Sequence, residues 1–252
     1  MLHLFKKIRK KLLKENRLKN YLVYALGEIL LVVIGILIAL AINNANQNRI
    51  IKNKEQNYLI GLKNEFSTSK AKLLELMKIN QENLITAKAI LIQIDKKEVS
   101  SSQLSSMLFQ TYSRDISFNP NNSLLLEMIS SGSLRELSNL NLRHNLTNWL
   151  ATLDDIAKQE KDLLAQREKA LDLFRSDEFS LRTILEQSGV SSQMGIPVTN
   201  QGSSILPILE SLEFENSLLQ FILSTEATQT LHYQPLLADL EIILEMLEKE
   251  IK

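Results

Sequence analysis

The pattern of hydrophobic and polar positions changes character near residue 43. Residues 21–42 read YLVYALGEILLVVIGILIALAI, an apolar stretch in which Glu28 is the one ionisable residue. Beyond it, apolar residues recur in steps of three and four with polar residues between them, which marks one face of an amphipathic helix. The pattern therefore predicts an almost wholly apolar helix followed by helices that each bury a single face.

The first amphipathic series predicts a long helix that continues directly out of the apolar stretch. Two polar residues, Ser69 and Asn80, are weak points in its apolar seam, and Lys96, Lys97 and the serines at 100–102 close it. A second helix is expected over 102–114. The seam consists of Tyr58, Leu62, Phe66, Ser69, Leu73, Leu76, Asn80, Leu84, Ala87, Leu91 and Ile94.

Residues 118–123, with the sequence FNPNNS, break the helical pattern. The proline disfavours the helical conformation of the residue before it, and the Asn and Ser side chains offer N-caps to a following helix. We expect a short helix through 124–129 that ends with Gly132 in the left-handed region. Ser133 and Glu136 then have the spacing of a capping box.

The most regular series lies between 142 and 174 and predicts a long, partly solvated helix whose seam is interrupted by Glu160 and Arg167. Gly, Pro, Ser, Gln and Asn gather at 188–204, a composition typical of an exposed loop. Two last helices are expected near 205–223 and 227–251. The long helix has its seam at Leu142, Leu146, Trp149, Leu153, Ile156, Glu160, Leu163, Arg167, Ala170 and Phe174, and the last one at Tyr233, Leu237, Leu240, Leu244, Leu247 and Ile251.

The apolar stretch is long enough to cross a membrane. At about 1.5 Å per residue it forms a helix of roughly 33 Å, and the hydrocarbon core of a bilayer is ~30 Å thick. Tyr21 and Tyr24 lie at one end, where aromatic rings with a polar tip favour the headgroup layer.

The balance of 29 basic against 29 acidic residues conceals an uneven distribution. Residues 1–20 hold eight basic side chains against Glu15, which is 8 − 1 = +7, whereas residues 43–252 sum to 21 − 27 = −6. Because the more basic flank of a span stays in the cytoplasm, we predict a single pass with the N-terminus cytoplasmic and residues 43–252 exported.

The apolar stretch has two alternative interpretations besides an uncleaved membrane anchor. A cleaved signal peptide would explain the basic start, the apolar stretch and the sequence Ala39-Leu40-Ala41, although its apolar part is usually only ~7–15 residues long. A buried helix of a soluble protein is the other, but a helix at a domain surface keeps a polar side, and residues 29–42 have none.

One face of the predicted span combines Glu28, Val32, Gly35, Ala39 and Ile42. Gly35 and Ala39 form a small-x-x-x-small pair that lets two helix backbones approach closely, with Glu28 as a polar contact beside it. We hypothesise self-association through this face. The alternative is that the Glu28 carboxylate reaches the interface or is protonated within the span.

The first twenty residues predict a basic amphipathic helix on the cytoplasmic membrane surface. Apolar residues recur there at intervals of three and four residues, and cations fill the other face. Each cation near anionic lipid contributes about 1 kcal/mol to membrane binding. Because this basic segment adjoins the span, we expect lipid contact and not nucleic-acid binding. The expected lipid contacts are Lys6, Lys7, Arg9, Lys10, Lys11 and Lys14.

The sequence contains no recognised catalytic motif. With no cysteine there is no disulfide, thiolate metal site or cysteine nucleophile, and none of the three histidines completes a Glu-x-x-His pair or a His-Glu-x-x-His motif. The pair Asp154-Asp155 points in two directions about 100° apart on a helix, which indicates a solvated face. Trp149 and Phe174 fall on the predicted seam, which favours core packing. We therefore expect no enzyme activity, no cofactor and no metal.

Several segments resemble an uncharacterised family of short single-pass membrane proteins of Gram-negative bacteria, a domain of unknown function. The resemblance is strongest in residues 21–44 and extends to residues 5–9, 118–122 and 130–134 and to Leu142-Arg143. At position 45, where a Trp is typical, this chain has Ala. The resemblance implies a bacterial inner-membrane protein with a periplasmic C-terminal region, and it implies no activity.

These observations predict an all-α protein: a basic cytoplasmic segment (1–20), a transmembrane helix (21–42) and an elongated antiparallel helical bundle in the periplasm (43–252), with the loop at 188–204. We expect an interaction or scaffold module that docks onto a partner protein or a second copy. The alternative is a sensor-like bundle that binds a small ligand and relays a helix shift to a membrane partner, which requires a concave apolar pocket with a few polar groups.

Overall fold

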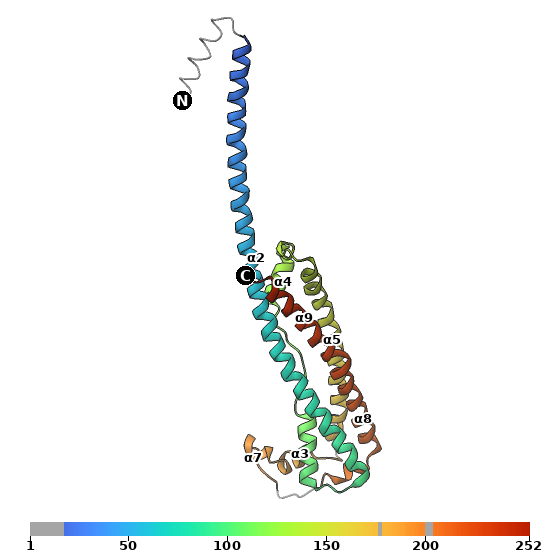
Figure 1. Cartoon of the computed structure of the whole chain (residues 1–252). Helices are drawn as coiled ribbons and strands as arrows, with labels where there is room; N and C mark the ends of the chain where they lie inside the picture. The colour runs from blue at the N-terminus through green and yellow to red at the C-terminus, as the bar shows by residue number, and fades with distance from the viewer. Residues whose placement is uncertain (1–17, 176–177, 200–203) are drawn as a thin grey trace. The chain divides into compact units, whose positions relative to one another are not determined.

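The computed structural model describes residues 18–175, 178–199 and 204–252, with side chains from Leu22 onward, and all regular structure in these ranges is helical (Figure 1). The all-α prediction is thus confirmed. The chain divides into two compact units, Met1–Glu55 and Gln56–Lys252. The lysines and the arginine expected to contact lipid lie outside the described residues.

The elements follow one another with short connections, except between α3 and α4 and between α7 and η3. They are α2 (Leu18–Lys96), α3 (Ser101–Tyr112), α4 (Ser123–Ser130), the 3₁₀-helix η1 (Ser133–Glu136), α5 (Leu140–Asp172), the 3₁₀-helix η2 (Leu173–Arg175), α6 (Leu181–Gln187), α7 (Val190–Met194), the 3₁₀-helix η3 (Leu206–Glu210), α8 (Leu212–Ala227), the π-helix η4 (Thr228–Tyr233) and α9 (Gln234–Glu250).

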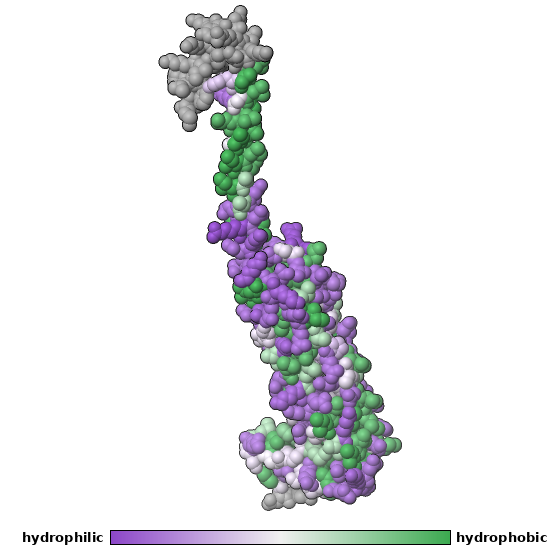
Figure 2. Space-filling view, in the orientation of Figure 1, coloured by the Kyte–Doolittle hydropathy of each residue, from purple (hydrophilic) through white to green (hydrophobic). Residues whose placement is uncertain are grey.

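The N-terminal unit contains the start of α2, including the predicted span. Leu, Ile and Val side chains between Leu22 and Ile42 are 46–70 % exposed, and Figure 2 shows a continuous hydrophobic surface along this stretch. This helix is long and apolar enough to cross a membrane, and no part of its apolar window is buried in the molecule. A core helix of a soluble protein would be covered by its neighbours.

In the second unit the C-terminal helices lie beside α2 and run in the opposite direction. Ion pairs join Lys63 to Glu248 at 3.0 Å, Lys70 to Glu241 at 2.7 Å and Lys88 to Glu226 at 2.6 Å. The residue number of the acidic partner falls as that of the lysine rises, as it does between antiparallel helices. Helix α5 packs against both α8 and α9. These exposed pairs fix the register of the helices more than they stabilise them, because each is worth about 0–1 kcal/mol.

The predicted seams supply most of the core between these helices. Leu62, Phe66 and Leu73 of α2 are at most 1 % exposed, as are Leu142 and Leu146 of α5. The seam tryptophan, Trp149, is also buried, with its ring 5.2 Å from that of Phe66 and 6.3 Å from that of Phe118. Its predicted role in core packing is confirmed.

The predicted capping box at Ser133 is wrong. Ser133 is the first residue of η1 and not an N-cap; the cap position belongs to Gly132, which has the expected positive φ of 75°. The four-residue 3₁₀ turn ends at Glu136 and is too short for the reciprocal bonds of a capping box. Such a box forms instead at the start of α3, between Ser100 and Gln103.

The helix after the FNPNNS break is also capped differently from the prediction. Asn122 makes no side-chain cap bond. The Glu65 carboxylate of α2 accepts the Leu124 and Leu125 N–H groups at 2.7 and 3.4 Å, so a side chain 59 residues earlier replaces the local cap. Gly61 makes room for this docking, because a side chain there would collide with Leu124.

The last third of the chain is more helical than predicted. The expected loop at 188–204 contains α7, which lies between two glycines with positive φ, Gly189 and Gly195. The expected break near 223–227 is absent, since α8 passes directly into η4 and then α9. Near this point the side chains of Glu226 and Gln229 bond to α2, and the Thr225 hydroxyl donates to a carbonyl of its own helix.

Candidate functional site: a buried polar layer

The predicted membrane-association residues all lie on α2 and face outward. Val32 is 55 % exposed, and a side chain at Gly35 would meet nothing within 4 Å. Glu28 and Ala39 are exposed as well. The described chain packs nothing against this face, so it is open to a second helix, and its self-association stays a prediction.

The polar residues that interrupt the predicted seams form hydrogen bonds inside the second unit, and we call them and their partners the polar layer. These residues are Ser69, Asn80, Glu160 and Arg167. At the centre of the layer the Glu160 carboxylate of α5 is 8 % exposed. Its Oε1 atom accepts the Phe118 N–H at 2.9 Å and the Tyr233 hydroxyl. One carboxylate therefore joins α5, the segment before α4 and the end of the π-helix.

The π-helix η4 is held by amide side chains from two other helices. Asn80 of α2 donates its Nδ2 to the Thr225 carbonyl at 3.0 Å and to Gln229 Oε1 at 2.9 Å. Gln159 of α5 donates to the Thr228 hydroxyl at 3.1 Å. A π-turn displaces the ordinary i+4 backbone bonds and is common at functional sites. In this chain, η4 presents polar side chains to Asn80 of α2 and to Gln159 of α5.

The ten residues 113–122 between α3 and α4, which we call the strap, contain no helix. Ser69, the first weak point of the α2 seam, accepts the Asn121 N–H at 2.8 Å and donates to the Asn121 carbonyl at 3.2 Å. Lys72 donates to the Asn119 carbonyl at 2.9 Å. The backbone of the strap therefore hydrogen-bonds to side chains of α2, because an irregular segment has no helical partners for its N–H and C=O groups.

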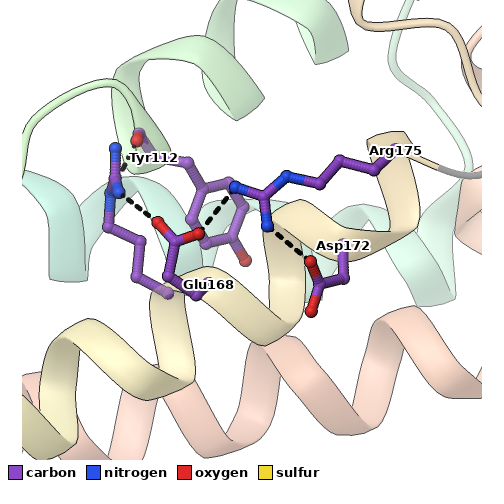
Figure 3. A network of polar contacts seen from close by, with 5 residues as sticks. Tyr112, Glu168, Asp172 and Arg175 are labelled. Atoms are coloured by element: carbon purple, nitrogen blue, oxygen red, sulfur yellow. Dashed lines mark hydrogen bonds and ion pairs between the residues drawn. The ribbon is translucent and has the colours of Figure 1, made fainter.

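The other end of the strap is fixed by arginines. Arg114 pairs with Glu82 of α2 at 2.9 Å. Arg167, the second interruption of the α5 seam, donates its Nε to the Tyr112 carbonyl at 2.8 Å and pairs with Glu168 at 3.0 Å. Figure 3 shows that Arg175 turns back to join Glu168 and Asp172, at 2.7 and 2.5 Å. This network orients Arg167 toward the start of the strap.

The electrostatics of the layer follow from its burial. Desolvation raises the pKa of Glu160, while the bonds from Tyr233 and Phe118 act in the opposite direction. Burial and the adjacent Glu160 charge raise the pKa of Tyr233, which keeps its hydroxyl a donor. Such a pair resembles an acid–base dyad, but Tyr233 is 0 % exposed and offers no face to a substrate.

Little space adjoins the layer. A cavity of about 10 Å³ lies among Asn83, Ile116, Leu163 and Arg167, which is room for one water molecule. In the part of the chain that the structure describes, no three His, Asp or Glu side chains come together as metal ligands do. The layer holds helices together and leaves no room there for a bound molecule.

Surface hollows lined by described residues include the following two. The larger, about 420 Å³, is shallow and lies beside the start of α3, where Ser102 and Ser106 already donate to the Gln187 and Ser102 carbonyls. The smaller, about 90 Å³, lies between α5 and α9 beside Trp149. The sequence pattern does not reveal either hollow, because each depends on how separate helices pack.

Comparison with known proteins supplies one match. Residues 28–154 match the profile of a family described as a family of unknown function (DUF6090). These residues, 154 − 27 = 127 of 252, are half of the chain and include Ser69, Asn80 and the strap. No curated protein and no solved structure matches the chain.

Proposed function

The chain belongs to the DUF6090 family of unknown function, and on that premise we propose that it is a non-enzymatic, membrane-anchored scaffold that docks onto a partner protein. In this proposal residues 21–42 span the bacterial inner membrane once. The N-terminus is cytoplasmic, its cations contact anionic lipid, and residues 43–252 form an antiparallel helical bundle in the periplasm.

The polar layer is the observation that carries this proposal. The buried groups best suited to chemistry, Glu160 and Tyr233, are bonded to each other and to the strap. Buried polar groups that are hydrogen-bonded to one another make a helical assembly rigid and specify its register. A rigid unit on a membrane anchor supports binding of a partner by an exposed helix face.

The alternative, a ligand sensor, needs an enclosed apolar pocket of about 300–1,000 Å³ for an ordinary small-molecule ligand. The cavity beside the strap has about 10 Å³ and the hollow beside Trp149 about 90 Å³. The hollow beside α3 reaches about 420 Å³, but it is shallow and open to solvent. None of these three is an enclosed apolar pocket of the required size, which favours the scaffold.

Crosslinking in native membranes tests the proposal. A photoreactive amino acid is placed at Leu223 of α8 and, separately, at Leu231 of η4, which are 70 % and 69 % exposed. We expect a discrete adduct with a second protein from at least one of these exposed positions. Phe214, which is 0 % exposed, is the matched control and should give no adduct.

The same experiment separates docking from anchoring. We expect the adduct to persist in Glu28→Gln if the partner contacts the second unit, and to disappear if the contact lies within the span. Adducts with copies of this chain alone would contradict a scaffold for a different protein.

A further inference from the structure

The hollow between α5 and α9 has an apolar floor and a rim of hydrogen-bond acceptors. Trp149 and Ile243, each 2 % exposed, form the floor with Ile242, and Asn145, Asn148 and Asp239 complete the lining. Its volume of about 90 Å³ suits a group of about five non-hydrogen atoms. No residue of the polar layer lines it.

The amide nitrogens of both asparagines are already engaged. Asn145 Nδ2 donates to Met246 Sδ at 3.1 Å, and Asn148 Nδ2 contacts His144 Nε2 at 3.0 Å. Each amide nitrogen has one further N–H, and neither Oδ1 atom has a hydrogen bond to the described residues. With the Asp239 carboxylate, these two oxygens favour a ligand that supplies N–H or O–H donors.

Asp239 gives the rim its charge. Other carboxylates of α9 are paired: Glu241 with Lys70 at 2.7 Å and Glu245 with Lys249 at 2.7 Å. Within the described ranges, the Asp239 carboxylate makes no ion pair or hydrogen bond. An unpaired carboxylate beside two amide oxygens favours a cation with several donors.

We propose that this hollow binds an organic cation, an ammonium or guanidinium group on a short alkyl stem. The head group lies against Asp239 and the asparagine oxygens, and the stem packs on Ile242 and Trp149. The cation is either a free amine or a lysine or arginine side chain of a partner protein. This site is independent of the scaffold proposal, which stands if the hollow binds nothing.

Trp149 makes the proposal directly measurable, because it is the one tryptophan in the chain. The full chain in zwitterionic nanodiscs is titrated with n-butylammonium at constant ionic strength. We expect a saturable change in tryptophan emission and in the single indole N–H resonance, with a Kd on the order of 1 mM. The neutral isostere n-butanol should give no saturable change.

Matched variants and a second probe complete the test. We expect Asp239→Asn to weaken binding about fivefold, as for the loss of one solvated ion pair, and Asp162→Asn, an exposed position of α5 outside the hollow, to leave it unchanged. Tighter binding of Nα-acetyl-lysine methylamide than of butylammonium would identify a partner side chain as the ligand, and the reverse order a free amine. No saturable change with either probe, or equal binding by Asp239→Asn, would overturn the proposal.

Discussion

Glu160 joins three segments of the chain through one oxygen atom, so its replacement should affect stability strongly. Replacement by Ala leaves the Phe118 N–H and the Tyr233 hydroxyl buried without an acceptor. An unpaired buried donor costs about 1–3 kcal/mol, so we expect Glu160→Ala to reduce the free energy of unfolding by about 3 kcal/mol. Denaturation of the full chain in detergent, followed by circular dichroism, measures this. Asp162→Ala, an exposed change on the same helix, should cost less than about 0.5 kcal/mol.

The pH dependence of this residue has a definite sign. Burial raises the pKa of Glu160 above its ordinary 4.5, so the folded state holds its proton more tightly than the unfolded chain does. The associated stability is present below pH 4.5 and is lost as the pH rises through the folded-state pKa. Both hydrogen bonds are on Oε1, so a proton on Oε2 leaves them intact.

Glu160→Gln isolates that effect, because glutamine keeps the shape and the Oε1 acceptor and stays neutral. We expect the variant to gain stability relative to the natural chain as the pH rises from 4 to 7. Melting temperatures of the two proteins at matched pH values measure the difference. A difference that stays constant across this range would show that Glu160 is not desolvated in solution.

At the scale of elements, the polar residues that interrupt the apolar seams bind the strap and the π-helix η4. Asn80→Leu would complete the apolar seam of α2, yet it removes the donor to the Thr225 carbonyl and to Gln229. We therefore expect a loss of about 1–2 kcal/mol instead of a gain. Asn64→Leu, the same change at an exposed position of α2, is the control. Equal stability of the two variants would contradict the role of Asn80 in holding η4.

These residues also show what could be predicted from the sequence. Local periodicity suffices for α2 and α5, since the helix repeat places Leu62 or Leu146 on the buried face without knowledge of the partner. It marks Ser69, Asn80, Glu160 and Arg167 only as defects. Their partners are 52, 145, 73 and 55 residues away, and no local pattern encodes such pairings. For the same reason, Glu65 as the cap of α4 could not be anticipated.

The predicted span offers a matched pair of alanines for testing the hypothesised association face. Ala39→Leu adds bulk beside Gly35, whereas Ala41→Leu adds the same bulk on another side of the helix, six residues and about 120° from Gly35. We expect Ala39→Leu to reduce the signal of a membrane-helix association reporter several-fold and Ala41→Leu to leave it unchanged. Equal signals from both variants would rule out this face.

At the scale of the whole molecule, the two units present different surfaces. The described part of Met1–Glu55 exposes its aliphatic side chains, whereas Gln56–Lys252 buries its seams and pairs many of its surface charges. The first surface suits lipid and the second suits water. In the proposed topology, the charge of +7 in residues 1–20 keeps the N-terminus in the cytoplasm, and residues 43–252, with a charge of −6, are exported.

Single-cysteine labelling tests this central claim most directly, because the natural chain contains no cysteine. In cells with a permeable outer membrane, we predict that a membrane-impermeant maleimide labels Ser192→Cys, at an exposed position of α7. Lys11→Cys should be labelled only after lysis, and both proteins should migrate at the full 28.7 kDa. Labelling of Lys11→Cys in intact cells, protection of Ser192→Cys, or loss of the first forty residues would contradict an uncleaved anchor with an exported helical unit.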